Sequence, residues 1–204
     1  MSVYRRRVDA AGGEELLFGP KNNATPGSWT PDGRFLLVQT LEAASPDVWL
    51  VPVIGDRTPR PLLATKDAEF GARVSPDGKW LAYASGTRPG DANVFLQPFP
   101  EPGSRIQIST GGGAFPIWSR SGHELFYMTR DTGIAAVSIQ TATSGIVPST
   151  PRLLFRAPMA FGGSLTPFAV SPDDQRFLIV SNSSRAARPI IVTTGWTALF
   201  SADR

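Results

Sequence analysis

The 204-residue sequence predicts an all-β fold made of repeated four-stranded antiparallel units. Three observations support this class: a turn motif that recurs about every 45 residues, an unbroken apolar triplet after each turn, and a content of 20 glycines and 19 prolines. Glycine and proline together exceed their average use in globular proteins, so chain reversals are frequent. No segment shows a sustained 3.6-residue apolar period, so we expect little helix.

The turn motif defines four segments that align with one another. The steps from Asp32 to Asp77, from Asp77 to Ser121 and from Ser121 to Asp173 are 45, 44 and 52 residues. Self-similarity at such a period is the signature of stacked structural repeats. The four segments are WTPDGRFLLVQT (29–40), VSPDGKWLAYAS (74–85), WSRSGHELFYMT (118–129) and VSPDDQRFLIVS (170–181).

The turn itself has residues suited to a β-hairpin. Proline presets the backbone of a type I turn, aspartate accepts hydrogen bonds from backbone amides, and glycine takes the left-handed position that rejoins the strands. The fourth copy has Asp174 where glycine is expected, which predicts a local strain of about 1 kcal/mol. The residues with this structural role are Asp32, Gly33, Asp77, Gly78, Gly122 and Asp173.

Three successive apolar residues follow each turn. Alternation would indicate a strand with one wet face, whereas an unbroken run indicates a strand buried on both faces between stacked sheets. The triplets are Leu36 to Val38, Leu81 to Tyr83, Leu125 to Tyr127 and Phe177 to Ile179.

Two further series of strand-like segments complete each period, so that each unit holds four short strands. Such units, packed face to face and joined by Gly/Pro turns, are β-propeller blades. A β-sandwich is the alternative, but its strands need not recur in groups of four with the same turn chemistry. The two series are 48–53, 94–99, 134–139 and 190–194, and 16–18, 61–64, 105–109 and 152–155.

We expect residues 1–204 to form a single β-propeller domain or the C-terminal part of one. Residues 14–18 are candidates for the missing outer strand of the last blade, which would close a four-bladed ring. A six- to eight-bladed parent propeller fits the known range better. An open array would expose apolar blade edges and favour self-association. The expected blades are 1–20 (partial), 26–65, 69–110, 114–156 and 165–196.

Composition excludes several classes of site and partner. The 20 basic and 17 acidic residues give a net charge of +3 without a basic stripe, so no nucleic-acid partner is predicted. The absence of cysteine excludes disulfides, Cys-ligated zinc and thiol catalysis. No apolar run is long enough to span a membrane, and the first 15 residues lack the apolar core of a signal peptide. The compartment is left open.

No catalytic, metal or cofactor site is predicted. Gly111 to Gly113 lack the following Lys-Ser/Thr of a phosphate-binding loop and fall between two blades. His123, the single histidine, aligns with Arg34 and Lys79 and is expected on the surface. A Gly-x-Ser-x-Gly elbow and the kinase signatures are absent.

The segments TPDGR, VSPDGKWLAYAS and LFYM, with the tail IIVTTGWTALF, carry a family resemblance. They resemble the WD-repeat-like repeats of TolB-like β-propellers, above all those found C-terminal to bacterial serine/threonine protein kinases. The resemblance implies a non-catalytic sensing or protein-binding module, often held outside the cytoplasm by a membrane helix. Ser121 and Asp174 depart from the family's turn pattern.

We therefore expect a binding module, not an enzyme, whose loops at one rim contact a protein or peptide. The alternatives are the gating propeller of a prolyl-oligopeptidase-like serine hydrolase, or a structural fragment without activity. The candidate rim residues are Glu69, Arg88, Asp91, Phe115, Arg130 and Asp131.

Overall fold

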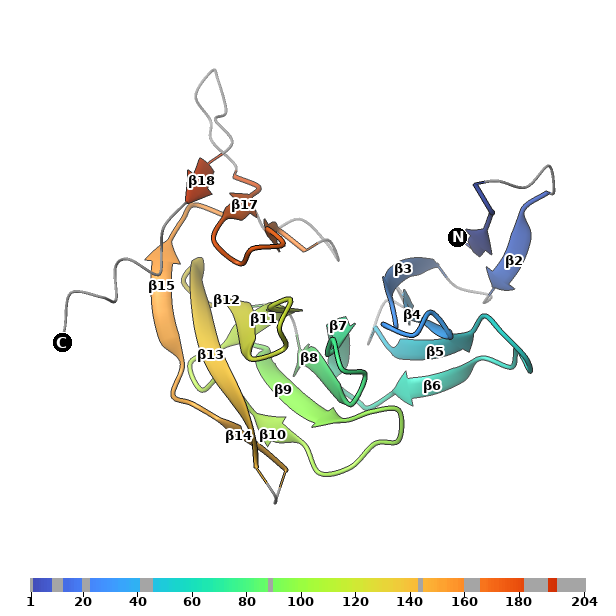
Figure 1. Cartoon of the computed structure of the whole chain (residues 1–204), viewed down its shortest axis with the longest axis horizontal. Coiled ribbons are helices and arrows are strands. Elements are labelled where there is room, and N and C mark those ends of the chain that lie inside the picture. Colours follow the sequence, from blue (N-terminus) through green and yellow to red (C-terminus); the bar gives the residue numbers. More distant parts are fainter. Residues whose placement is uncertain are drawn as a thin grey trace.

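The computed structural model describes residues 2–8, 13–19, 23–40, 46–87, 90–142, 145–159, 166–181 and 191–193. Every regular element among them is a β-strand, which confirms the all-β prediction. Within these ranges no helix exists that has the length and hydrophobicity to cross a membrane. The strands form five antiparallel sheets that follow one another along an open arc (Figure 1).

Three of the sheets hold four or more antiparallel strands. The first comprises β3 (Ala24–Trp29), β4 (Phe35–Thr40), β5 (Val48–Pro52) and β6 (Arg60–Leu63). The second comprises β7 (Ala68–Val74), β8 (Trp80–Gly86), β9 (Asn93–Pro98) and β10 (Ile106–Gln107). The third comprises β11 (Gly113–Trp118), β12 (Glu124–Thr129), β13 (Gly133–Ala142), β14 (Gly145–Pro148) and β15 (Arg152–Arg156).

Smaller sheets form the two ends of the arc (Figure 1). At the N-terminal end β1 (Val3–Arg5) pairs with β2 (Glu15–Phe18). At the C-terminal end β16 (Phe168–Val170), β17 (Phe177–Ile179) and β18 (Ile191–Thr193) form a three-stranded sheet. Because β2 pairs with β1, residues 14–18 do not complete the last sheet in the way that ring closure would require.

The second strand of each complete sheet is buried on both faces. Leu37 of β4 lies in one cluster with Leu81 and Tyr83 of β8, so this cluster joins two neighbouring sheets. Phe126 of β12 meets Phe177 of β17 edge to face, with ring centroids 5.3 Å apart. Burial of each such side chain stabilises the folded state by about 1.5 to 3 kcal/mol. The contact between sheets is therefore the main source of stability.

The apolar triplet of β17 departs from the expected double burial. Phe177 and Ile179 are buried, whereas the side chain of Leu178 is 52% exposed. The neighbouring sheet covers one face of β17, and the other face carries Leu178 at this end of the arc. The expectation of two buried faces is therefore wrong for this strand.

The turns have the hydrogen bonds that their sequence favours. Thr30 Oγ1 donates to Asp32 Oδ1 at 2.5 Å, and the same oxygen accepts the Arg34 amide at 3.0 Å. These bonds lower the pKa of Asp32. Ser75 and Asp77 repeat the contact at 2.5 Å. The residue that closes each turn has a positive φ: Gly33 (69°), Gly78 (75°), Gly122 (76°) and Asp174 (57°).

The longer third repeat results from an added hairpin. Strand β13 runs ten residues, well beyond the segment 134–139 expected from the sequence, and its end pairs with β14. Its first part pairs with β12 on one side and β15 on the other. The extra residues between Ser121 and Asp173 thus lengthen β13 and add β14, whose Ile146 packs in a buried cluster with β9 of the second sheet.

Asp174→Gly is expected to stabilise the fold, because glycine adopts φ near 57° without the clash of a Cβ atom. The loss of the weak contacts from the Arg120 amide to the Asp174 carboxylate, at 3.3 Å, reduces this gain. We expect up to about 1 kcal/mol, or a rise in Tm of about 2 to 4 °C, measured by thermal unfolding. Asp174→Ala loses the same contacts without relieving strain and should lower Tm. An unchanged or lowered Tm for the glycine variant would contradict the assigned strain.

Candidate functional site

The first strands of the complete sheets, β3, β7 and β11, lie on the inner side of the arc (Figure 1). Each contains a break in register with its neighbour: between Pro26 and Trp29 in β3, between Phe70 and Arg73 in β7, and after Ala114 in β11. A bulge of this kind bends a strand and changes where its side chains point. The inner side therefore has irregular backbone where the rest of each sheet is regular.

A cleft of about 380 Å³ lies between β3, β4 and β7. This volume is within the range of sites that bind small molecules or short peptide segments. Apolar residues form much of its wall, and a few polar residues complete it. The polar side chains that line it are Thr25, Gln39, Arg73 and Thr166.

Arg73 supplies the positive charge of the cleft. Its side chain is half-buried, and its guanidinium donates to the Ala72 carbonyl at 3.1 Å and to Thr166 Oγ1 at 3.4 Å. Trp118 of the next sheet donates its indole N–H to the Arg73 carbonyl at 3.2 Å. The residue is thus held by its own strand, by the next sheet and by the segment that precedes β16.

Sequence analysis did not identify this cleft, although one signal was present. The position two residues before each turn is occupied by Ser28, Arg73, Ile117 and Ala169. Only one of the four repeats has a charged residue at this position, whereas the other three have a small or apolar residue. Such a break in a repeat pattern marks a residue that the fold does not itself require.

The predicted rim residues fall into two groups. Asp91 and Arg130 lie 3.6 Å apart as an ion pair, and Asp131 pairs with Arg156. Gly112 packs closely on the side chain of Arg130, which brings three loops to one edge of the arc. Arg88 lies outside the described residues.

Glu69 and Phe115 lie in the interior of the same part of the structure. Phe115 is 2% exposed and packs on Phe70, with ring centroids 5.6 Å apart. Its φ of 53° is unusual for a bulky side chain and matches the φ of 65° at Gly71, the corresponding bulge residue of β7. These two predicted residues therefore shape the backbone near the cleft and do not present exposed side chains.

The chain is similar to known proteins in both sequence and structure. A stretch of 72 residues, 35% of the chain, is 33% identical to the Tol-Pal system protein TolB of Anaeromyxobacter dehalogenans. The structure superposes on TolB from Acinetobacter baumannii with a TM-score of 0.62 over 89% of the chain, at 14% identity. The chain has a TolB-like β-propeller fold. No protein-family model matches it.

The chain matches only part of the length of these relatives. The matched stretch is 16% of the Anaeromyxobacter protein, and the superposition covers 43% of the Acinetobacter chain. A structure of prolyl endopeptidases is also similar, with a TM-score of 0.51 over 78% of this chain and 26% of that one, at 14% identity. Because one fold carries unrelated functions, function has to be argued from the site.

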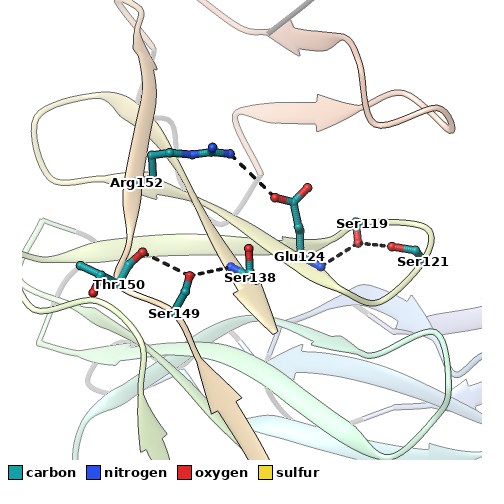
Figure 2. A network of polar contacts seen from close by, with 7 residues as sticks. All are labelled: Ser119, Ser121, Glu124, Ser138, Ser149, Thr150 and Arg152. Carbon is teal, nitrogen blue, oxygen red and sulfur yellow. Dashed lines mark hydrogen bonds and ion pairs between the residues drawn. The ribbon is translucent and has the colours of Figure 1, made fainter. Parts of the chain in front are cut away.

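A second polar cluster of the TolB-like propeller surrounds the β11–β12 turn and extends to Arg152 of β15 (Figure 2). Ser119 Oγ accepts the Glu124 amide at 3.0 Å and lies 3.1 Å from Ser121 Oγ. The Glu124 carboxylate is 3.9 Å from the Arg152 guanidinium, and burial raises its pKa. In the described part of the chain the His123 imidazole has no hydrogen-bond partner. The cluster braces the turn against β15.

Metal ligands do not gather in the described residues. No group of three His, Cys, Asp or Glu side chains there is placed to hold an ion. The buried carboxylate of Glu69 is instead hydrogen bonded to the Thr65 hydroxyl, to the Thr65 amide at 3.3 Å and to Ser85 Oγ at 3.5 Å. Burial raises its pKa, although the bonds from Thr65 oppose this effect.

Glu69→Gln is expected to change how stability depends on pH. Because the folded pKa is raised, the folded state of the wild type holds its proton more tightly than the unfolded state, so its stability falls as pH rises above the unfolded value of about 4.3. The variant lacks this dependence. Chemical denaturation from pH 4 to pH 8 should show the wild type losing stability relative to the variant.

Glu69→Ala is the matched control, because it removes the acceptor for Thr65 and Ser85. We expect it to cost about 1 to 3 kcal/mol at every pH in that range. A wild type that gains stability relative to Glu69→Gln with rising pH would show that the carboxylate is stabilised in its charged form.

Proposed function

We propose that this chain is a non-catalytic binding module in which the cleft between β3, β4 and β7 receives a segment of a partner protein or a peptide. The observation that carries the proposal is the cleft itself, because its volume of about 380 Å³ is combined with a half-buried arginine on bulged backbone. Concave sites with a few fixed polar groups are typical of ligand recognition. The similar TolB proteins are named as members of the Tol-Pal system, which supports a role among proteins.

The cleft is favoured over the rim because of how the charges are arranged. At the rim, Asp91 pairs with Arg130 and Asp131 pairs with Arg156, so these charges already have partners. In the cleft, Arg73 contacts a carbonyl and a hydroxyl. A ligand in the cleft meets a charge whose donors are partly free, whereas a ligand at the rim first has to displace an ion pair.

The cleft is tested by blocking it. Peptides are selected from a random displayed library on the immobilised protein, and their affinity is measured by fluorescence polarisation. Thr25→Trp fills the cleft and should weaken selected peptides at least tenfold, because it removes the space they occupy. Thr58→Trp, which makes the same change at an exposed loop residue outside the cleft, should leave their affinity unchanged.

The rim is tested with the same peptides. Alanine at Arg88, Asp91, Arg130 and Asp131 should leave affinity within twofold of the wild type if the cleft is the site. Peptides that bind Thr25→Trp as tightly as the wild type, and lose affinity with the rim variant, would overturn the cleft and favour the rim.

Self-association is a second proposed property, supported by the exposed apolar side chains at both ends of the arc. Leu178 and Val180 are 52% and 60% exposed at one end, and Tyr4 and Leu16 are 57% and 55% exposed at the other. We propose that these faces pair with a second copy of the chain, since exposed apolar sheet faces associate.

Light scattering after size exclusion should show a mass that rises with concentration. Leu178→Lys should shift the protein towards the monomer, because it places a charge on the paired face. Val147→Lys, at a residue 50% exposed in the β13–β14 hairpin of the third sheet, should not. A monomer at all concentrations would contradict the pairing.

We propose a bacterial serine/threonine kinase as the class of parent polypeptide, in line with the sequence resemblance. The gating propeller of a prolyl-oligopeptidase-like hydrolase is the alternative, supported by the similarity to prolyl endopeptidases. The neighbouring coding sequence discriminates between them. Kinase signatures support the first, and a Gly-x-Ser-x-Gly elbow supports the second.

A further inference from the structure

Arg73 projects from the bulge of β7, and its guanidinium is only partly engaged. A guanidinium has five N–H donors in a planar fork. The structure gives two of them partners, the Ala72 carbonyl at 3.1 Å and Thr166 Oγ1 at 3.4 Å. The Thr166 hydroxyl is 93 residues away in sequence, so the contact fixes the guanidinium between two distant parts of the arc.

The charge of Arg73 is not balanced by a carboxylate in the described part of the chain, where no Asp or Glu forms an ion pair with it. Arg5, Arg152 and Arg176 differ, since each lies beside a carboxylate, at 2.6, 3.9 and 3.2 Å. A half-buried cation without a counter-charge is costly to desolvate. Burial accordingly lowers the pKa of Arg73.

We propose that Arg73 binds a carboxylate of the peptide segment that enters the cleft, either an Asp or Glu side chain or a C-terminal carboxylate. This inference rests on the proposed function. The planar fork of arginine matches the two oxygens of a carboxylate. Arg73 is the one charged residue that lines the cleft, and its single positive charge balances one monoanion. Thr25 and Gln39 line the same space and offer neutral hydrogen-bonding groups.

The test titrates small probes into the protein and follows the Arg73 Nε–Hε signal by NMR. The probes are the blocked tripeptide N-acetyl-Gly-Asp-Gly-amide, its Asn counterpart, and N-acetyl-Gly-Gly-Gly with a free C-terminus. We expect saturable shifts with the Asp peptide, the free C-terminal peptide or both, and at least tenfold weaker binding of the Asn peptide. Which of the two binds identifies the source of the carboxylate.

Three variants accompany the titration. Arg73→Gln should weaken the acidic probe at least tenfold, and Arg73→Lys should weaken it less because it keeps the charge but loses the fork. Arg105→Gln removes the same charge from an exposed residue that lies over the Phe95 ring, outside the cleft, and should leave affinity unchanged. Thermal unfolding of each variant shows whether it is folded.

Equal affinity for the Asp and Asn probes, together with no binding of the free C-terminal peptide, would overturn the proposal, as would an unchanged affinity in a folded Arg73→Gln variant. Inorganic phosphate that binds more tightly than the Asp probe would also overturn it, in favour of a phosphoryl ligand. Library peptides that depend on Thr25 but not on an acidic residue would leave the cleft as the binding site while removing the carboxylate. Failure of the inference is thereby distinct from failure of the proposed function.

Discussion

The face-to-face contact between neighbouring sheets is the interaction on which the rest of this structure depends. Each complete sheet buries its second strand on both sides, and side chains such as Leu37, Leu81 and Phe126 reach a neighbouring sheet or lie against one. No single sheet has enough apolar partners of its own to bury these residues. The blades therefore stabilise one another in sequence along the arc, as expected for repeat proteins.

Packing between sheets requires regular backbone in the middle strands of each sheet but not in the inner strand. Bulges at the inner strands break register without disturbing the packed strands behind them. Strand β7 carries two half-buried or buried charges, Glu69 and Arg73, and they are balanced differently. Glu69 is held by hydroxyl and amide donors near its own turn, whereas Arg73 contacts a hydroxyl from a distant segment. Glu69 is thus satisfied within its own sheet, whereas Arg73 also depends on a partner from a distant segment.

The outer hairpins show the same separation of roles. The added β13–β14 hairpin lengthens the third repeat, and the serine cluster beside it braces a turn, yet the packed strands keep the pattern of the other sheets. The hairpin adds to the contact between sheets, because Ile146 of β14 lies in one buried cluster with Val94 and Leu96 of β9.

The turns and most of the strands could be predicted from the sequence, because these features follow from local chemistry. The Thr-Pro-Asp-Gly and Ser-Pro-Asp-Gly turns carry their own hydrogen-bond partners within a few residues, and the apolar triplets of β4, β8 and β12 mark strands buried on both faces. The triplet of β17 and the added strand β14 could not be predicted in this way, because Leu178 lies at the end of the arc and β14 depends on packing with the second sheet. Which polar residues line the cleft depends on tertiary structure. The burial of Glu69 and Phe115 and the meeting of Arg73 with Thr166 depend on bulge geometry and on segments far apart in the chain. No local pattern encodes those distances, since they arise from how the sheets stack.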